Sequence, residues 1–368
     1  MKRASLCGGG KRYDMKKIIA LLLALSLMLA LAACVSPKTE YDLETADWDQ
    51  ILADAKGSTV TIAVPQSDWI AAVADHVQEH YGITLKVVEG DTADILCLDA
   101  AGEDLYGPFT DKLPNMAEVE ASCQVPYQKN QFVMYADTAL VQNLPSSWQT
   151  LEALCQTFPG RVAYPALSDE TGTAFVCSII YEVCGWKQFQ TMEADYDTVK
   201  AAVEPAMAFL RALNPSLWGG GQSFPTAAEL DAMYASGEVV MAMSADPFAA
   251  GAEDFPEMTA SFVFAKGTPG STEYLVIPAA SSNKAGAMAV LNAMLSAELQ
   301  LDRYAQFRQM PVIDTAKLSD GERAAFDAVD LGRGVLSRSE LASHCLPDMP
   351  EALIPVIQEI WLNEVVGK

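Results

Sequence analysis

Two of the chain's three histidines lie in a pattern that could bind a catalytic metal. His76, Glu79 and His80 fit H-x-x-E-H, the inverted zinc-protease motif, in which a helix brings both imidazoles to one face. The apolar residues of this segment recur on the opposite side of the helix, which favours a solvated polar face. A zinc-dependent hydrolase is therefore the least favoured function, and we expect no catalytic residue, no metal and no cofactor.

Cysteine chemistry of another kind is indicated near the N-terminus. Lys16 and Lys17 precede an apolar run over residues 18–33, which ends in Leu31-Ala32-Ala33-Cys34. A run this short, with small residues at its end, predicts a signal peptide rather than a transmembrane anchor or a buried helix. The last four residues resemble the lipobox of bacterial lipoproteins. The resemblance implies cleavage before Cys34 and lipidation of Cys34.

These features predict how the N-terminal segment is processed. We expect residues 1–33 to be a lipoprotein signal peptide whose translation starts at Met15, and residues 34–46 to be the lipidated cysteine and a polar tether. Cleavage before Cys34 removes six Lys or Arg residues and one Asp, which changes the net charge from −24 to −29. A body this acidic repels phosphate backbones, so nucleic-acid binding is excluded as a function class.

Six cysteines remain in the mature body besides Cys34. None forms a C-x-x-C pair, which leaves a zinc or redox motif without support. Cys177 and Cys184 share one face of a predicted helix but lie about 10 Å apart along it, too far for a disulfide. The pairing of the others stays open; they are Cys97, Cys123, Cys155 and Cys345.

Strand and helix patterns alternate in the first part of the body. A β-branched strand over 59–64 is followed by a helix from Trp69 to Tyr81, and strands are predicted over 83–88 and 93–98. This alternation indicates an α/β fold with a parallel sheet and crossover helices. Further strands are expected at 131–136, 161–164, 238–243, 261–264 and 274–277, and helices at 48–56, 148–157, 174–183, 198–213, 284–296, 298–307 and 351–366.

Four segments resemble extracellular solute-binding proteins of ABC importers, family 1. They occur in the family's order and spacing, and they cover about residues 59–310. The segments are Trp148-Gln149-Thr150-Leu151-Glu152-Ala153-Leu154, Ala235-Ser236-Gly237-Glu238-Val239-Val240-Met241, Leu275-Val276-Ile277-Pro278 with Asn283-Lys284-Ala285-Gly286-Ala287, and Leu295-Ser296-Ala297-Glu298-Leu299-Gln300. Asp169-Glu170-Thr171-Gly172-Thr173-Ala174-Phe175 is similar to an uncharacterised branch, in which position 170 is usually aromatic, so Glu170 departs from that pattern.

The resemblance implies a two-lobe, periplasmic-binding-protein-like (type II) fold with crossover hinge strands. Lobe 1 would hold residues 47–133 and 275–368, and lobe 2 would hold residues 134–274. The lobes would close over one solute by hinge motion. The implied partners are a small solute, the permease and ATPase subunits of an ABC importer, and the membrane through Cys34. The chain is expected to act as a monomer outside the cell or in the periplasm.

Candidate ligand-binding residues follow from the rule that ligands lie beyond the carboxyl ends of strands in open α/β sheets. In lobe 1 the rule selects Ser67 and Trp69 after the first strand, and it adds Thr92 and Asp94 beside the third. Trp69 could stack on a planar or cationic solute. The alternative is that Trp69 packs within its own lobe.

In lobe 2 the candidates lie at a helix start, a glycine-rich loop and a strand end. Free N–H groups at the helix start attract oxygen atoms of a ligand, although simple capping by the threonines is the alternative. An aspartate after the strand could pair with a cation or cap the next turn, and a tryptophan before Gly219 could act as a lid or lie in a surface linker. These candidates are Asp169, Thr171, Gly172, Thr173, Trp218, Ser244 and Asp246.

The candidate carboxylates and tryptophans together favour an organic cation, thiamine-like or polyamine-like, over an oxyanion. Ferric iron is less favoured because the adjacent tyrosine pair typical of iron binders in this superfamily is missing. A receptor that senses its solute without transporting it is the alternative function. The sequence does not separate sensing from import.

Overall fold

The structure is a computed structural model that describes residues 46–89, 93–98, 124–278 and 280–366. From Trp48 onward the chain forms one unit, which contains both lobes. Its strands are β1 Thr59–Ala63, β2 Thr84–Val87, β3 Ile95–Leu98, β4 Val125–Lys129, β5 Val133–Asp137, β6 Met241–Ser244, β7 Thr259–Phe262, β8 Thr268–Gly270, β9 Thr272–Val276 and β10 Cys345–Pro347. Its α-helices are α2 Trp48–Ala55, α3 Asp68–Tyr81, α4 Trp148–Thr157, α5 Glu170–Cys184, α6 Tyr196–Leu213, α7 Ala227–Ala235, α8 Lys284–Met294, α9 Ala297–Ala305, α10 Asp320–Asp327, α11 Arg338–Ser343 and α12 Ile354–Trp361.

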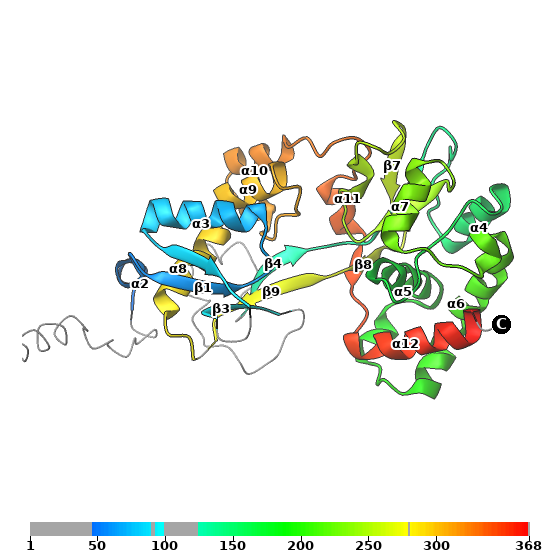
Figure 1. Ribbon diagram of the computed structural model, residues 1–368, viewed down its shortest axis with the longest axis horizontal. Helices are drawn as coiled ribbons and strands as arrows, with labels where there is room; N and C mark the ends of the chain where they lie inside the picture. The colour runs from blue at the N-terminus through cyan, green and yellow to red at the C-terminus, as the bar shows by residue number, and fades with distance from the viewer. Residues whose placement is uncertain (1–45, 90–92, 99–123, 279, 367–368) are drawn as a thin grey trace, which may run out of the picture. The chain divides into compact units, whose positions relative to one another are not determined.

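The first lobe is built on a five-stranded sheet in the order β2-β1-β3-β9-β4 (Figure 1). β1 pairs in parallel with both β2 and β3, which confirms the predicted parallel sheet, and β9 runs antiparallel between β3 and β4. Helix α8 packs against α2, α3 and β1. Ser67 caps α3 by accepting a hydrogen bond from the Ile70 amide at 3.3 Å, so the helix begins where the sequence predicts.

The second lobe surrounds a three-stranded antiparallel sheet in the order β6-β5-β7. Its helices α4 and α6 pack on α5, which also contacts β6. Ser147 closes a capping box with Thr150, so α4 begins at Trp148, where the sequence predicts the helix to start. Residues 161–164 are extended but form no strand, because their carbonyls accept hydrogen bonds from Val240 and Trp218, which come from separate loops.

Two of the segments that cross between the lobes are hydrogen-bonded to each other. Asn130, which follows β4, exchanges backbone hydrogen bonds with Ser271, at 3.0 and 3.1 Å. The Phe132 amide then donates to the Pro269 carbonyl at 2.9 Å. This ladder continues the β4–β9 pairing out of the first sheet (Figure 1), so the two crossing segments form one ribbon. The described fold is thus a two-lobe α/β fold with crossover hinge strands.

The C-terminal segment differs from the expectation that residues 275–368 all belong to lobe 1. β10 pairs with β8, and α12 packs against α6 of the second lobe. Trp361 lies 3 % exposed in the second-lobe core, and its indole Nε1–H donates to the Tyr164 hydroxyl at 3.1 Å. The apolar face of α12 therefore packs against the second-lobe core rather than against lobe 1.

Two further expectations concern cysteines and membrane segments. Cys155, Cys177, Cys184 and Cys345 are free thiols, which agrees with the exclusion of a Cys177–Cys184 disulfide. Within the described residues, no helix is long and apolar enough to cross a bilayer. The signal peptide, Cys34, Thr92 and Cys123 lie outside the described residues.

The packing of α12 predicts a large difference between two adjacent substitutions. Trp361→Ala should lower the free energy of unfolding by about 3–5 kcal/mol, because it removes a buried aromatic ring from the second-lobe core. Leu362→Ala, at a side chain 55 % exposed, should change it by less than about 0.5 kcal/mol. Guanidinium denaturation of both variants measures the difference, and equal effects would contradict the assignment of this helix to the core.

Candidate functional site

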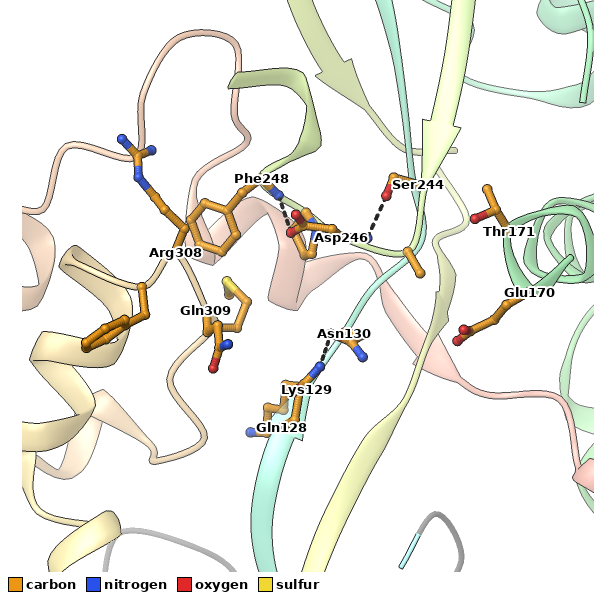
Figure 2. A pocket seen from close by; sticks show the side chains of 14 residues that line it. Gln128, Lys129, Asn130, Glu170, Thr171, Ser244, Asp246, Phe248, Arg308 and Gln309 are labelled. Atoms are coloured by element: carbon orange, nitrogen blue, oxygen red, sulfur yellow. Dashed lines mark hydrogen bonds between the residues drawn. The ribbon is translucent and has the colours of Figure 1, made fainter. Parts of the chain in front are cut away.

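A cavity of about 490 Å³ lies where residues of both lobes meet beside the crossing ribbon (Figure 2). The first lobe contributes the end of β4 and the segment after α9. The second lobe contributes the start of α5 and the loop after β6. The cavity is lined by Gln128, Lys129, Asn130, Glu170, Thr171, Ser244, Ala245, Asp246, Pro247, Phe248, Phe307, Arg308, Gln309 and Met310.

Asp246 is held in the loop at the carboxyl end of β6 by two local hydrogen bonds. Its amide donates to the Ser244 hydroxyl at 2.9 Å, and its Oδ1 accepts from the Phe248 amide at 2.9 Å. Desolvation by the surrounding walls raises the pKa of the Asp246 carboxyl, and the Phe248 hydrogen bond offsets part of that shift. Among the described residues, Oδ2 accepts no hydrogen bond, so the carboxylate keeps acceptor capacity for a solute.

The start of α5 forms the neighbouring part of the wall. Asp169 caps the helix, because its Oδ1 accepts from the Thr171 amide and its Oδ2 accepts from the Ala227 amide, both at 2.9 Å. Glu170 and Thr171 then line the cavity, and Glu170 points into it (Figure 2). The positive end of the helix dipole lies at this point. Asp169 therefore positions the wall, whereas Glu170 presents a carboxylate to the cavity.

Gly172 serves packing rather than ligand contact. A Cβ at this position would lie 2.2 Å from the Ala166 carbonyl oxygen and 2.4 Å from that of Pro165. Only glycine lets the first turn of α5 approach the 165–166 backbone so closely. The predicted ligand role of Gly172 is therefore replaced by a close backbone contact that fixes the position of the helix start.

A second cavity, of about 680 Å³, adjoins the first and shares Asn130, Glu170 and Ala245 with it. Asp169 and Thr173 line this second cavity, and the Thr173 hydroxyl donates to the Leu167 carbonyl at 2.9 Å. No lysine or arginine occurs among its described lining residues, whereas five carboxylates do. These are Asp169, Glu170, Glu273, Asp348 and Glu351.

The first-lobe wall was not predicted from the sequence. The Gln128 side-chain amide donates to the Asn130 side-chain carbonyl at 3.2 Å, which orders the end of β4. Arg308 adopts the left-handed conformation with φ 52°, unusual for a residue that is not glycine. Its guanidinium donates to the Leu331 carbonyl and extends away from the other labelled side chains (Figure 2). For this wall the sequence predicts only that a helix ends near Phe307. The segment that follows the helix contains no motif that would mark it as part of a binding site.

Three predicted residues line the first cavity together: Thr171, Ser244 and Asp246. Asp169 and Thr173 line the adjoining one. Ser67 caps α3, and neither cavity includes it among its described lining residues.

Asp94, Trp69 and Trp218 have structural roles instead of the predicted ligand contacts. Asp94 is 7 % exposed and accepts hydrogen bonds from the Thr61 amide, the Thr61 hydroxyl and the Ser281 hydroxyl. The bonds from Thr61 connect β1 to the residue that directly precedes β3.

Each of the two tryptophans contacts other residues of its own lobe. Trp69 is 1 % exposed, and its ring lies under the Arg303 guanidinium with 4.2 Å between the guanidinium carbon and the ring centroid. The Trp218 indole N–H donates to Glu238 at 2.8 Å, and the ring packs on the second-lobe core. The Trp69 ring is therefore buried within its own lobe, whereas Trp218 is half-buried and lines neither of the two cavities.

The histidine motif has no further metal ligands in the described part of the chain. The His76 and His80 rings stack with centroids 4.1 Å apart, and His80 Nδ1 lies 2.9 Å from the His76 carbonyl oxygen. Partial burial, followed by the charge of His80, lowers the pKa of His76. No group of three or more potential ligands gathers among the described residues. The arrangement is that of a polar helix face.

A family model for bacterial extracellular solute-binding proteins matches residues 38–325. The chain belongs to this family. Protein YnjB of Escherichia coli K12 is 26 % identical over an alignment of 377 positions, which covers 86 % of this chain and 92 % of YnjB. An ABC transporter structure from Clostridium perfringens superposes with a TM-score of 0.60 at 19 % identity, covering 83 % of this chain and 99 % of the other. The PotD substrate-binding protein of a Streptococcus pneumoniae spermidine/putrescine transporter gives a TM-score of 0.59 at 14 % identity, covering 83 % and 99 %.

Family and fold together define the general function of the chain. It is a two-lobe solute-binding receptor that acts outside the cytoplasm and delivers its solute to an ABC importer. Members of this family are binding proteins, which agrees with the low weight given to catalysis by the His76–His80 motif.

Proposed function

We propose that the chain is a lipid-anchored receptor for an organic cation, which it binds in the cavity walled by Asp246 and Glu170. The observation behind this proposal is the pair of carboxylates that the second lobe presents to one cavity, next to the Phe248 ring. A cation gains from a partly desolvated carboxylate and from the face of an aromatic ring. Phe248 thus has the aromatic role that was predicted for Trp69 and Trp218.

The charge distribution around the site supports a cation rather than an anion. Lys129 and Arg308 also line the first cavity, but the Arg308 guanidinium donates to the Leu331 carbonyl and extends away from Asp246 and Glu170 (Figure 2). The adjoining cavity adds carboxylates and no described basic residue. An elongated cation with two charged groups could place one at Asp246 and the other beyond Glu170, since Glu170 lines both cavities.

Closure of the lobes around this solute would follow from the crossing ribbon. We propose that residues 47–133 and about 275–332 move as one lobe, and that residues 134–274 move together with the C-terminal segment from Arg333 onward, whose Gly334 carbonyl accepts a hydrogen bond from the Ser261 amide at 2.7 Å. Bending at the Asn130–Ser271 ladder would bring the first-lobe wall toward Asp246 and Glu170. The lipid on Cys34 would hold the receptor near its permease and raise its effective concentration there.

Carboxylate removal should weaken cation binding. We expect Asp246→Asn and Glu170→Gln each to raise the Kd for putrescine at least tenfold, because each removes a charge-assisted contact inside the cavity. Isothermal titration of the lipid-free body measures this, with succinate as the anionic comparison. The matched control is Glu257→Gln, at an exposed acid that lines none of the cavities, and it should bind as the wild type does. Equal Kd values in all variants, or preference for succinate, would contradict the proposal.

Cation binding should also weaken on acidification. Because desolvation raises the pKa of Asp246, this carboxyl takes up its proton at a higher pH than an ordinary aspartate, whose pKa is about 3.9. Affinity should therefore be full well above the raised pKa and fall by up to about tenfold per pH unit below it. Titrations between pH 7.5 and 4.5 should show a shallower slope for Asp246→Asn, whereas Glu257→Gln keeps the wild-type slope. Identical slopes in all three proteins would exclude Asp246 as the titrating group.

Membrane attachment should depend on one thiol. Cys34→Ser in the full chain should abolish lipidation, because the acyl chains are attached through that residue. The protein should then be released to the soluble fraction or be retained only as a precursor with its apolar signal segment uncleaved. Fractionation of expressing cells with labelling by a palmitate analogue measures both properties. Cys97→Ser provides the control and should stay lipidated. Continued labelling of the Cys34→Ser protein would refute the lipid anchor.

A further inference from the structure

Arg303 on α9 is a fully buried cation between two aromatic rings. Its side chain is 0 % exposed. The guanidinium carbon lies 4.2 Å from the centroid of the Trp69 ring and 5.3 Å from that of the Tyr127 ring. Arg303 therefore joins three elements of the first lobe: α9, the start of α3 and β4.

The contact with β4 falls on an irregularity of the strand. The β4–β9 register shifts between Pro126 and Gln128, so Tyr127 is the extra residue of a bulge. A bulged residue drops out of the ladder and changes the direction of the strand that follows. An N–H of Arg303 Nη1 donates to the Tyr127 carbonyl at this point. The next three residues, 128–130, line the first cavity.

The main chain of the same arginine supports the other strip of the first-lobe wall. The Gln309 amide donates to the Arg303 carbonyl at 3.2 Å, which closes the turn that contains Arg308 in its left-handed conformation. Residues 307–310 of this turn line the cavity. The two cavity-lining strips of the first lobe thus meet at one residue, through its side chain and through its backbone.

Stability alone does not account for this side chain. Arg303 Nε and Nη2, and Trp69 Nε1 beside them, are buried and have no hydrogen-bond partner among the described residues. Burial lowers the pKa of Arg303 to about 10. A buried charge with unsatisfied donors is destabilising, and an apolar side chain of similar volume is often neutral or stabilising in its place.

We infer that Arg303 is a positioning residue that sets the first-lobe wall of the solute cavity by clamping the Tyr127 bulge and the Gln309 turn. Its role as a determinant of solute affinity rests on the proposed function of that cavity. Its effect on the geometry of the two strips does not depend on any solute.

The test separates positioning from bulk stability. In Arg303→Met, amide hydrogen exchange of solute-free protein should accelerate at least tenfold in peptides covering 125–131 and 305–311, while the denaturation midpoint is unchanged or raised. Arg303→Lys should restore part of the protection, because the ammonium can still donate to the Tyr127 carbonyl. The Kd for putrescine should rise at least fivefold in Arg303→Met.

Arg211→Met is the matched control. Arg211 also donates to a backbone carbonyl, that of Glu364, but in the second lobe. This variant should lower the midpoint and leave exchange in the two strips unchanged. The inference is overturned if Arg303→Met leaves exchange in both strips at the wild-type rate, or if exchange rises uniformly along the chain as the midpoint falls. If wild type does not bind putrescine, the cation proposal fails while the exchange result still decides the role of Arg303.

Discussion

The pairing of the two crossing segments is the constraint on which the site depends. Asn130 and Ser271 exchange backbone hydrogen bonds, and the Thr268 hydroxyl donates to the Phe132 carbonyl at 2.6 Å just beyond them. Asn130 lines both cavities. A paired ribbon resists sliding of one segment past the other but can bend and twist, so it restricts the lobes to hinge-like motion and keeps the site in register.

The two walls of the cavity differ in how they are built. On the second lobe, local hydrogen bonds fix the functional groups: Ser244 holds Asp246, and Asp169 caps the helix turn that presents Glu170. On the first lobe, long-range contacts fix the wall, because Arg303 joins segments about 175 residues apart in sequence. Local turns tolerate changes elsewhere in the fold, whereas the first-lobe wall depends on the packing of α9 against β4. Substitutions remote from the cavity are therefore expected to act mainly through the first lobe.

This difference also explains how much of the site the sequence could predict. Periodicity was sufficient to predict β1, α3 and α4, and the serines that cap the two helices, Ser67 and Ser147, act within their own turns. The strand-end rule likewise selected Asp246, which lines the first cavity and is held by local hydrogen bonds. It failed for Trp69, because the partner that covers this ring, Arg303, comes from a distant helix whose packing no local pattern encodes.

The cavity-lining segments 128–130 and 307–310 could not be predicted from the sequence either, because long-range packing positions them. A bulge and a left-handed arginine leave no signal in periodicity. The C-terminal helix was assigned to lobe 1 but packs on lobe 2. Its amphipathic pattern predicts that one face is buried, but the pattern does not show which lobe covers that face.

The carboxylates around the two cavities connect solute binding to lobe closure. Five of them lie around the adjoining cavity with no described lysine or arginine among them, and closing the lobes in the absence of a cation would increase their mutual repulsion. On the proposal of a cationic solute, its binding would remove that repulsion and favour the closed arrangement. The same charges that select the solute would thus keep the unliganded receptor open, and a ligand shifts such an equilibrium only by its differential affinity for the two states. A neutral solute of the same shape would fill the cavity without relieving the repulsion, so charge, rather than fit alone, would determine which solutes close the receptor.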